Sequence, residues 1–275
     1  MTLFDDFRYD GKRAVVVGGA TGMGAATAEL LLDSGAEVVV MDVAEVSLAG
    51  AKAIRLNLAE KKSIDAAITE CGGPVHALFS CAGVADGTPG IERINFVGHR
   101  YLIDRMIGSG MIPKGSTIGF ISSAAGLGWE RNLSELKEWI AISDFDEATR
   151  WAEEHGKCDY MSTKQAICAY VATQCMPLLK LGIRINAICP GPTDTPLAQA
   201  NKETWLSFGS DYRSEVGVEA STPLEQAYPL VFLGSDAARA VAGVTLITDV
   251  GYFSAGMTDA YPAAAPAVNF LLGRY

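Results

Sequence analysis

The sequence predicts an α/β fold: a single-domain, doubly wound parallel sheet of about seven strands, with helices on both faces. Three observations lead to this fold class. Short apolar, β-branched segments alternate with helical segments along the chain. The apolar segments show no polar alternation, which is typical of strands buried on both sides. No internal repeat or linker divides the 275 residues, so one domain spanning 1–275 is expected.

Each element follows from its local pattern. The first strand, 13–18, reads RAVVVG and ends in glycines, and helix 22–34 then stops at Gly35. The further predicted strands are 37–41, 53–56, 75–80, 116–122, 184–188 and 244–248, and the further helices are 61–71, 91–109, 159–180 and 223–233. This alternation predicts parallel strands with helical crossovers. Pro177 is expected to kink or end its helix.

Two segments stand outside the alternation. Residues 127–156 are charged and carry apolar side chains at helical spacing, which predicts a helical insertion. Residues 254–275 form a tail rich in proline and alanine that ends in apolar side chains. A tail of this character is expected to pack on its own domain or on a neighbouring subunit.

The charge balance excludes several classes of function. With 22 basic and 32 acidic residues, the chain has a formal charge of −10, so neither nucleic acid nor an anionic membrane is an expected partner. Its first residues, MTLFDDFRYDGKR, lack the features of a signal peptide, and no segment has the length and apolarity of a membrane span. Six scattered cysteines without a CxxC pair indicate reduced thiols in a cytoplasmic protein. The three histidines form no cluster, so no metal site is expected.

A glycine-rich turn joins the first strand to the first helix. Glycines permit a tight turn and close approach of a pyrophosphate, and the following helix N-terminus offers free N–H groups. Asp42, at the end of the second strand, can accept hydrogen bonds from both adenosine ribose hydroxyls and repels a 2′-phosphate, which favours NAD over NADP. A purely structural turn and a solvated strand-end acid are the alternatives. The candidate residues of the turn are Gly18, Thr21, Gly22, Met23 and Gly24.

A candidate catalytic group lies later in the chain. Tyr160 and Lys164 are four residues apart on a predicted helix and therefore share one face. A nearby ammonium, together with an oxidised nicotinamide, favours the phenolate of a tyrosine that would otherwise be a poor base. Ser122 and Ser123 end a predicted strand, where a hydroxyl can donate to a substrate oxygen.

From residue 11 to about 253 the chain resembles the short-chain dehydrogenase/reductase superfamily, which has a Rossmann-type fold. The glycine turn matches TGxxxGxG with Val17 in place of threonine, and the pair Tyr160/Lys164 matches YxxxK. The resemblance selects Ser123 as the catalytic serine, with Ser122 as the fallback, and implies that Asn95 orders a water in a proton relay. It also implies further cofactor contacts, with Ile188 lining the nicotinamide ring and Thr195 holding its carboxamide. Besides Ile188, the residues that the resemblance places against the cofactor are Asn57, Leu58, Cys81, Ala82, Gly83, Pro190, Gly191, Thr193 and Thr195.

The resemblance implies an alcohol dehydrogenase in which Tyr160 exchanges the proton and Lys164 also binds the nicotinamide ribose. The insertion resembles a bacterial subgroup that includes 3α-hydroxysteroid dehydrogenase/carbonyl reductase and coniferyl-alcohol dehydrogenase-like enzymes. Segment 196–222 would be the substrate lid, and its aromatic residues favour a bulky apolar alcohol or ketone as the small-molecule partner. A homo-oligomer is expected, with a dimer favoured and a tetramer the alternative. A catalytically silent NAD-binding module and an enzyme of other nucleotide chemistry are the competing hypotheses.

Overall fold

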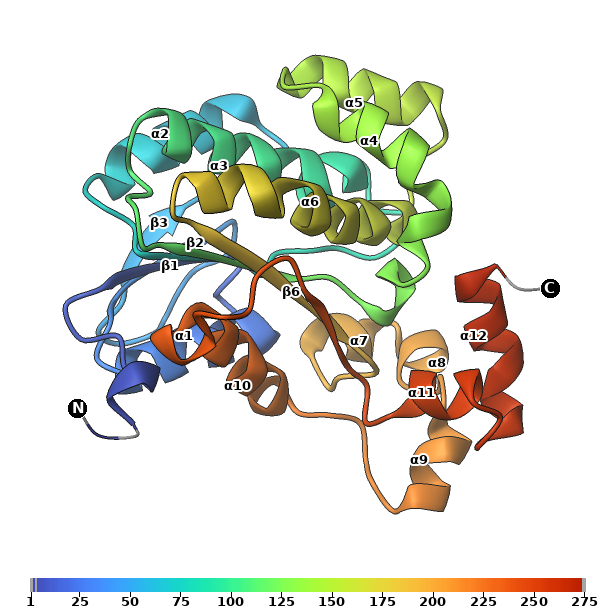
Figure 1. The fold of residues 1–275 in the computed structure, drawn as a ribbon. Coiled ribbons are helices and arrows are strands. Elements are labelled where there is room, and N and C mark those ends of the chain that lie inside the picture. Colours follow the sequence, from blue (N-terminus) through green and yellow to red (C-terminus); the bar gives the residue numbers. More distant parts are fainter. Residues whose placement is uncertain (1, 3, 274–275) are drawn as a thin grey trace.

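Seven parallel strands form one sheet in the computed structural model, which describes residue 2 and residues 4–273 (Figure 1). The strand order is β3-β2-β1-β4-β5-β6-β7, and every neighbouring pair is parallel. The predicted fold class is therefore confirmed. The strands are β1 (Arg13–Val17), β2 (Glu37–Asp42), β3 (Lys52–Arg55), β4 (Ala77–Ser80), β5 (Thr117–Ile121), β6 (Arg184–Pro190) and β7 (Thr245–Thr248). The order reverses between β1 and β4, and ligands of such sheets bind beyond the strand ends at that point.

Helices cover both faces of this sheet (Figure 1). Alternate residues of each central strand point to opposite sides, so Val15 and Val17 join one buried cluster while Ala14 and Val16 join the other. One face is covered by α2 (Lys61–Cys71), α3 (Gly98–Gly108) and α6 (Tyr160–Lys180), and the other by α1 (Gly22–Asp33) and α10 (Pro223–Gly234). Single turns of 3₁₀-helix occur at Asp5–Phe7, Ala124–Gly126, Trp129–Asn132, Asp236–Ala238 and Pro262–Ala264.

Two helices, α4 (Leu133–Ala141) and α5 (Phe145–Glu154), occupy the segment predicted as an insertion. They form a hairpin whose apolar side packs into the cluster shared with α3 and α6. Trp139 is fully buried, lies edge-on to Phe96 at 4.8 Å between ring centroids, and donates its indole N–H to the carbonyl of Ala148. The guanidinium of Arg100 on α3 donates to carbonyls at the end of α4 and in the loop that follows. The hairpin is therefore part of the main core.

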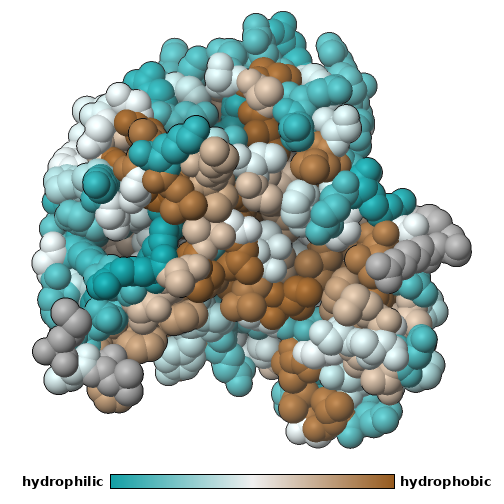
Figure 2. Space-filling model, viewed as in Figure 1, coloured by the Kyte–Doolittle hydropathy of each residue, from teal (hydrophilic) through white to brown (hydrophobic). Residues whose placement is uncertain are grey.

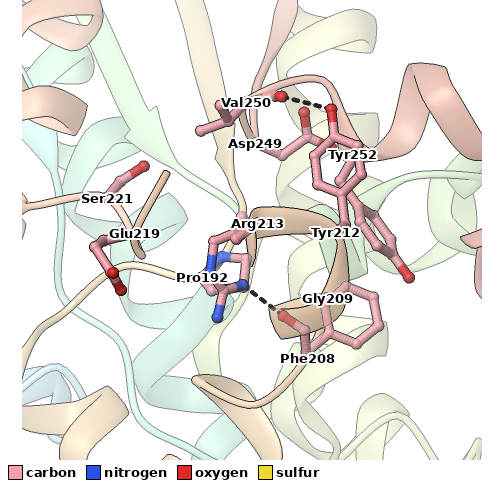
Figure 3. Close-up of a pocket in the computed structure, with 11 residues that line it drawn as sticks. Pro192, Phe208, Gly209, Tyr212, Arg213, Glu219, Ser221, Asp249, Val250 and Tyr252 are labelled. Atoms are coloured by element: carbon pink, nitrogen blue, oxygen red, sulfur yellow. Dashed lines mark hydrogen bonds between the residues drawn. The ribbon is translucent and has the colours of Figure 1, made fainter. Parts of the chain in front are cut away.

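Short helices build the predicted lid and the tail. The lid contains α7 (Pro196–Ala200), α8 (Lys202–Trp205) and α9 (Ser210–Val216), and the described part of the tail contains α11 (Tyr252–Met257) and α12 (Ala265–Leu272). Residues 274–275 of the predicted tail lie outside the described residues. Phe208, Tyr212 and Tyr252 pack together beside a hollow of only about 10 Å³, and Tyr212 donates to the carbonyl of Val250 (Figure 3). The hydrogen bond fastens the lid to the loop after β7, and the ring contacts fasten it to the start of α11.

Two helices differ from their predicted form. A π-helical turn, Arg93–Val97, precedes α3, where the sequence predicts one regular helix. It coincides with a close approach at Gly98, where a Cβ would lie 2.4 Å from the carbonyl oxygen of Leu58. Helix α6 continues past Pro177 to Lys180, so the proline does not end it. Pro177 is exposed and lies in the last turn, where the carbonyl that loses its N–H partner can bind water. Across the described part of the chain, no helix is both long and apolar enough to span a bilayer.

Candidate active site

A cavity of about 250 Å³ lies at the carboxyl ends of β1, β2 and β4. It is the place where the strand order reverses, as expected for a ligand site in an open parallel sheet. Most of the residues predicted to bind a dinucleotide line it together. They are Gly18, Thr21, Gly22, Met23, Gly24, Asp42, Asn57, Leu58, Cys81, Ala82, Gly83 and Thr195. Sequence reasoning missed the apolar lining residues, because no motif assigns them to a ligand; they are Val17, Met41, Val43, Leu56, Val84, Ile94, Pro196 and Leu197.

Two positions of the glycine turn, Gly18 and Gly24, leave no room for a Cβ atom. Gly18 has a φ of +83°, and a Cβ there would lie 2.4 Å from the Ala82 backbone. A Cβ on Gly24 would lie 2.0 Å from the carbonyl oxygen of Gly18. Thr21, which precedes α1, makes no side-chain cap hydrogen bond, so the first N–H groups of α1 have no side-chain acceptor beside the cavity. This cradle of backbone and helix N-terminus fits a pyrophosphate.

Asp42 supports the turn from the end of β2. One carboxylate oxygen accepts the N–H of Ala20 and the other accepts the N–H of Ala44, each at 2.9 Å. These bonds fix the carboxylate at the cavity wall. Each carboxylate oxygen can accept a second hydrogen bond, so Asp42 retains the capacity to bind two ribose hydroxyls.

The remaining predicted cofactor residues fall into two groups. Thr195 caps α7 by accepting the Ala198 N–H and lies over the glycine turn, with its side chain 3.4 Å from the Cβ position of Gly22. Asn57 lines the cavity while its carboxamide accepts the N–H of Ala59 and donates to the carboxylate of Glu60, in the turn before α2. Pro190, Gly191 and Thr193 do not line this cavity in the described structure. They form the path from β6 to the lid, where Thr193 donates to the carbonyl of Gly191 and Gly191 packs against Asp249.

Tyr160 and Lys164 share one face of α6, as their spacing predicts. The Lys164 ammonium lies 5.5 Å from the centre of the Tyr160 ring and donates to the carbonyl of Ile121 at 3.0 Å. Burial lowers the pKa of Lys164 to about 8. Burial raises the pKa of the Tyr160 phenol to about 12, and the hydrogen bond with Ser123 opposes that rise. The phenol is therefore protonated at neutral pH in this structure.

The two candidate serines, Ser122 and Ser123, have different surroundings in the structure. Ser123 is partly exposed, its hydroxyl accepts the N–H of Ala125, and its side chain acts on Tyr160 by lowering the pKa of the phenol. Ser122 is buried, and its hydroxyl donates to the carbonyl of Lys164 at 2.9 Å. Ser123 can therefore share a substrate oxygen with Tyr160, whereas Ser122 holds the backbone of α6.

Asn95 is buried in the π-helical turn and braces the segment after β4. Its carboxamide oxygen accepts the N–H of Val84, and its amide donates to the carbonyl of Val84 and to the hydroxyl of Thr163. A Cβ on Gly83 would lie 3.5 Å from the Asn95 oxygen and 3.4 Å from the Lys164 ammonium. Asn95 thus lies beside the lysine, and its predicted role in ordering a water stays a prediction.

Other polar groups near the site are held in neutral forms. His99 donates from Nε2 to the carbonyl of Ala82 at 3.0 Å, and burial lowers its pKa to about 4. Burial raises the pKa of Cys81 to about 12, and burial with the nearby Glu92 raises that of Cys158 to about 11. Neither thiol is a nucleophile at neutral pH. Among the described residues, no group of three His, Cys, Asp or Glu side chains is placed to hold a metal ion.

The lid contributes an aromatic cover. Trp205, the last residue of α8, lies against Tyr160 with 4.9 Å between ring centroids and 45° between ring planes. A substrate that reaches the phenol must therefore pass or displace this side chain. Trp205 was predicted only as one apolar residue of the lid, since nothing in the local sequence places it on the tyrosine.

Comparisons with known proteins find relatives over most of the chain. A family model described as enoyl-(acyl carrier protein) reductase matches residues 134–253. A cis-4-hydroxycyclohexanecarboxylate dehydrogenase of Sinomonas cyclohexanicum is 31% identical over 87% of this chain and 95% of its own. A 3-alpha-hydroxysteroid dehydrogenase/carbonyl reductase of Comamonas testosteroni is 28% identical over 86% of this chain and 95% of its own. The crystal structure of a 3-alpha-hydroxysteroid dehydrogenase from Pseudomonas sp. B-0831, complexed with NADH, superimposes with a TM-score of 0.72 at 24% identity, covering 91% of this chain and 99% of that one.

Proposed function

Because the chain belongs to the short-chain dehydrogenase/reductase superfamily and is an oxidoreductase, we propose that it interconverts an alcohol and its ketone or aldehyde with NAD. The observation that carries the proposal is the grouping of Ser123, Tyr160 and Lys164 next to the glycine-lined cavity, where the Lys164 ammonium lies 3.4 Å from the Cβ position of Gly83. The glycine turn would hold the pyrophosphate, and Asp42 would hold the adenosine ribose. NAD, when bound, supplies the acceptor for the hydride that leaves the carbinol carbon.

In the proposed mechanism, side chains of the protein transfer the proton of the substrate hydroxyl. In oxidation the phenolate of Tyr160 takes the hydroxyl proton while the C–H bond breaks and the C=O bond forms. Ser123 donates a hydrogen bond to the same substrate oxygen as its charge develops. The Lys164 ammonium, 5.5 Å from the ring, favours the phenolate. The overall change is alcohol plus NAD⁺ to carbonyl, NADH and one proton, and reduction runs through the same contacts in reverse.

The first prediction concerns cofactor choice. Asp42→Ala is expected to lower the preference for NAD over NADP by about 10- to 100-fold, because it removes a charged acceptor and a repulsive charge. The measurement is kcat/KM for each cofactor, with their dissociation constants from fluorescence titration. Asp33→Ala, which removes an exposed acid at the end of α1, is the matched control. An unchanged preference in Asp42→Ala would refute the assigned role.

The proposed substrate is a bulky, uncharged alcohol of the hydroxysteroid type. The support is the apolar lid with Trp205 over Tyr160, together with the similarity to a hydroxysteroid dehydrogenase/carbonyl reductase. The charged groups that contact Tyr160 in the described structure are Lys164, which is directed to a carbonyl, and the carboxylate of Asp86. The negative charge of Asp86 disfavours a substrate carboxylate, and the Lys164 ammonium is already engaged by the carbonyl of Ile121. A coniferyl-type aryl alcohol is the alternative substrate.

A substrate panel tests the function. The panel contains a 3α-hydroxysteroid, coniferyl alcohol and cis-4-hydroxycyclohexanecarboxylate, each with NAD, followed by NADH absorbance. The steroid is expected to give the highest kcat/KM and the anionic hydroxy acid the lowest. NAD binding without turnover of any alcohol or ketone would instead favour a silent binding module.

The six free cysteines fit the cytoplasmic setting that we also propose.

We also propose a homodimer formed by α10 and β7. The α4–α5 hairpin packs over α3 and α6 and limits pairing through those helices. Figure 2 shows apolar side chains gathered across the middle of the face that carries β7. Large apolar side chains remain exposed on α10 and around β7, which is unusual for a lone subunit. These residues are Leu224, Tyr228, Phe232, Leu246 and Val250.

The second prediction follows from this surface. Light scattering is expected to give a dimer for the wild type and a monomer for Tyr228→Glu, since the substitution places a charge in the apolar interface. Met176→Glu, which changes an exposed apolar residue of α6, is expected to stay dimeric. A wild-type tetramer, or dissociation by Met176→Glu, would contradict the proposed interface.

A further inference from the structure

A carboxylate from a distant loop binds the backbone of the predicted catalytic tyrosine. Asp86 lies in the segment between β4 and α3, and its Oδ1 accepts the N–H of Tyr160 at 2.6 Å, although the residues are 74 positions apart. The segment is tied down on its other side as well, since both backbone groups of Val84 bond to Asn95. It therefore connects the cavity wall at Gly83 to the first turn of α6.

Two carboxylates accept backbone N–H groups at the start of this helix. The first turn of a helix leaves backbone N–H groups without intrahelical partners, and negative charge is favoured there. Asp159 is the N-cap and accepts the N–H of Ser162 at 2.8 Å. Asp86 accepts the N–H of Tyr160, so the N–H of the tyrosine itself is bound from outside the helix. Loss of Asp159 would loosen the helix end, whereas loss of Asp86 would release the tyrosine from the cavity wall.

We propose that Asp86 is a positioning residue for Tyr160, which fastens the first turn of α6 to the cavity wall and holds a negative charge at the backbone of the tyrosine. This inference rests on the proposed oxidoreductase function. Asp86 touches neither the reacting atoms nor the cavity in the described structure. It acts through the place and the protonation of the tyrosine.

The negative charge of Asp86 acts on the pKa of Tyr160 in one direction. The groups that face Tyr160 are Asp159 and Lys164 on its own helix, Ser123 after β5, Cys189 on β6, Asp86 from the loop, and the uncharged Trp205 from the lid. Burial is the largest cause of the raised Tyr160 pKa. Ser123 lowers this pKa, whereas Asp86 and Cys189 raise it further. A nearby negative charge disfavours the phenolate, so Asp86 helps to keep the proton on Tyr160, and the protonated phenol is the form that acts as the acid in carbonyl reduction.

Three variants test the inference through pH profiles. Asp86→Asn keeps an acceptor oxygen and removes the charge, Asp86→Ala removes both, and Asp159→Asn is the matched control at the same helix end. The expected result is that the rising limb of kcat/KM for alcohol oxidation moves about one pH unit lower in Asp86→Asn. Asp159→Asn is expected to leave the limb in place. Coincident limbs for the wild type and both Asp86 variants would overturn the inference.

A second measurement does not depend on turnover. The amide signal of Tyr160 in ¹⁵N-tyrosine-labelled protein can be assigned among the nine tyrosines by its loss in Tyr160→Phe. It is expected to move upfield in Asp86→Ala and to stay near its wild-type position in Asp86→Asn. An unchanged signal in Asp86→Ala would overturn the positioning role. Absence of wild-type turnover with every panel substrate would count against the proposed function alone, because the amide signal still reports on Asp86.

Discussion

Replacing Tyr160 by phenylalanine is expected to lower kcat/KM for alcohol oxidation by about 100- to 10,000-fold, the usual range for loss of a general base. The substitution removes one oxygen and leaves the ring against Trp205 in place. NAD binding should survive, because the glycine turn and Asp42 lie elsewhere in the cavity. The measurements are steady-state kinetics on the best substrate of the panel and fluorescence titration of NADH.

The pH dependence of the wild type belongs to the same prediction. Because the pKa of Tyr160 is raised to about 12, oxidation is expected to accelerate with rising pH, as more phenolate forms. Above the lowered Lys164 pKa of about 8, loss of the ammonium charge opposes this gain. Tyr101→Phe, which removes a phenol bound to Asp65 on α2, is the matched control and should keep wild-type activity. Full activity in Tyr160→Phe would eliminate the proposed mechanism.

The second large effect distinguishes two adjacent serines. Ser123→Ala is expected to lower kcat by about 100- to 1,000-fold, because it removes the hydroxyl that can donate to the developing charge on the substrate oxygen. Ser122→Ala is expected to change kcat less than about tenfold and to lower the free energy of unfolding by about 1 kcal/mol. It loses the buried hydrogen bond to the carbonyl of Lys164.

Kinetics and thermal unfolding of both variants decide between the serines. The pair is matched, since both substitutions remove one hydroxyl from neighbouring positions at the end of β5. If Ser122→Ala caused the larger loss of kcat with an unchanged melting temperature, the assignment would be reversed and Ser122 would be the residue that contacts the substrate.

Local patterns were sufficient for the sheet and for the superfamily. The apolar run of a buried strand such as Val38–Val40 and the alanine-rich pattern of α1 can each be recognised from neighbouring residues alone. The seven strands were therefore predicted within a few residues. The resemblance to the short-chain dehydrogenase/reductase superfamily is confirmed by the comparisons. Local pattern predicted the part of the cavity lining that the glycine turn and Asp42 form, whereas Asn57 to Leu58, Cys81 to Gly83 and Thr195 were predicted only through the resemblance to the superfamily.

Other features could not be predicted because they depend on contacts between distant segments. The π-helical turn at Arg93–Val97 lies beside the contact between Gly98 and the carbonyl of Leu58, which lies 40 residues earlier. The insertion was predicted to be helical, but its pattern does not show that Trp139 would lie fully buried against Phe96. Pro177 was expected to kink or end a helix, and only its exposed place in the last turn explains why α6 continues to Lys180.

The sequence by itself determined the parallel α/β sheet, the glycine cradle, Asp42 and the helical pairing of Tyr160 with Lys164. In each case the information lies within one strand, one turn or one helix. Only the tertiary structure decided that Ser123 faces the tyrosine while Ser122 holds the helix, that Trp205 covers the phenol, and that Asp86 binds the N–H of Tyr160. The physical reason is that these contacts join segments 37 to 74 residues apart, and their geometry is set by packing of the whole sheet.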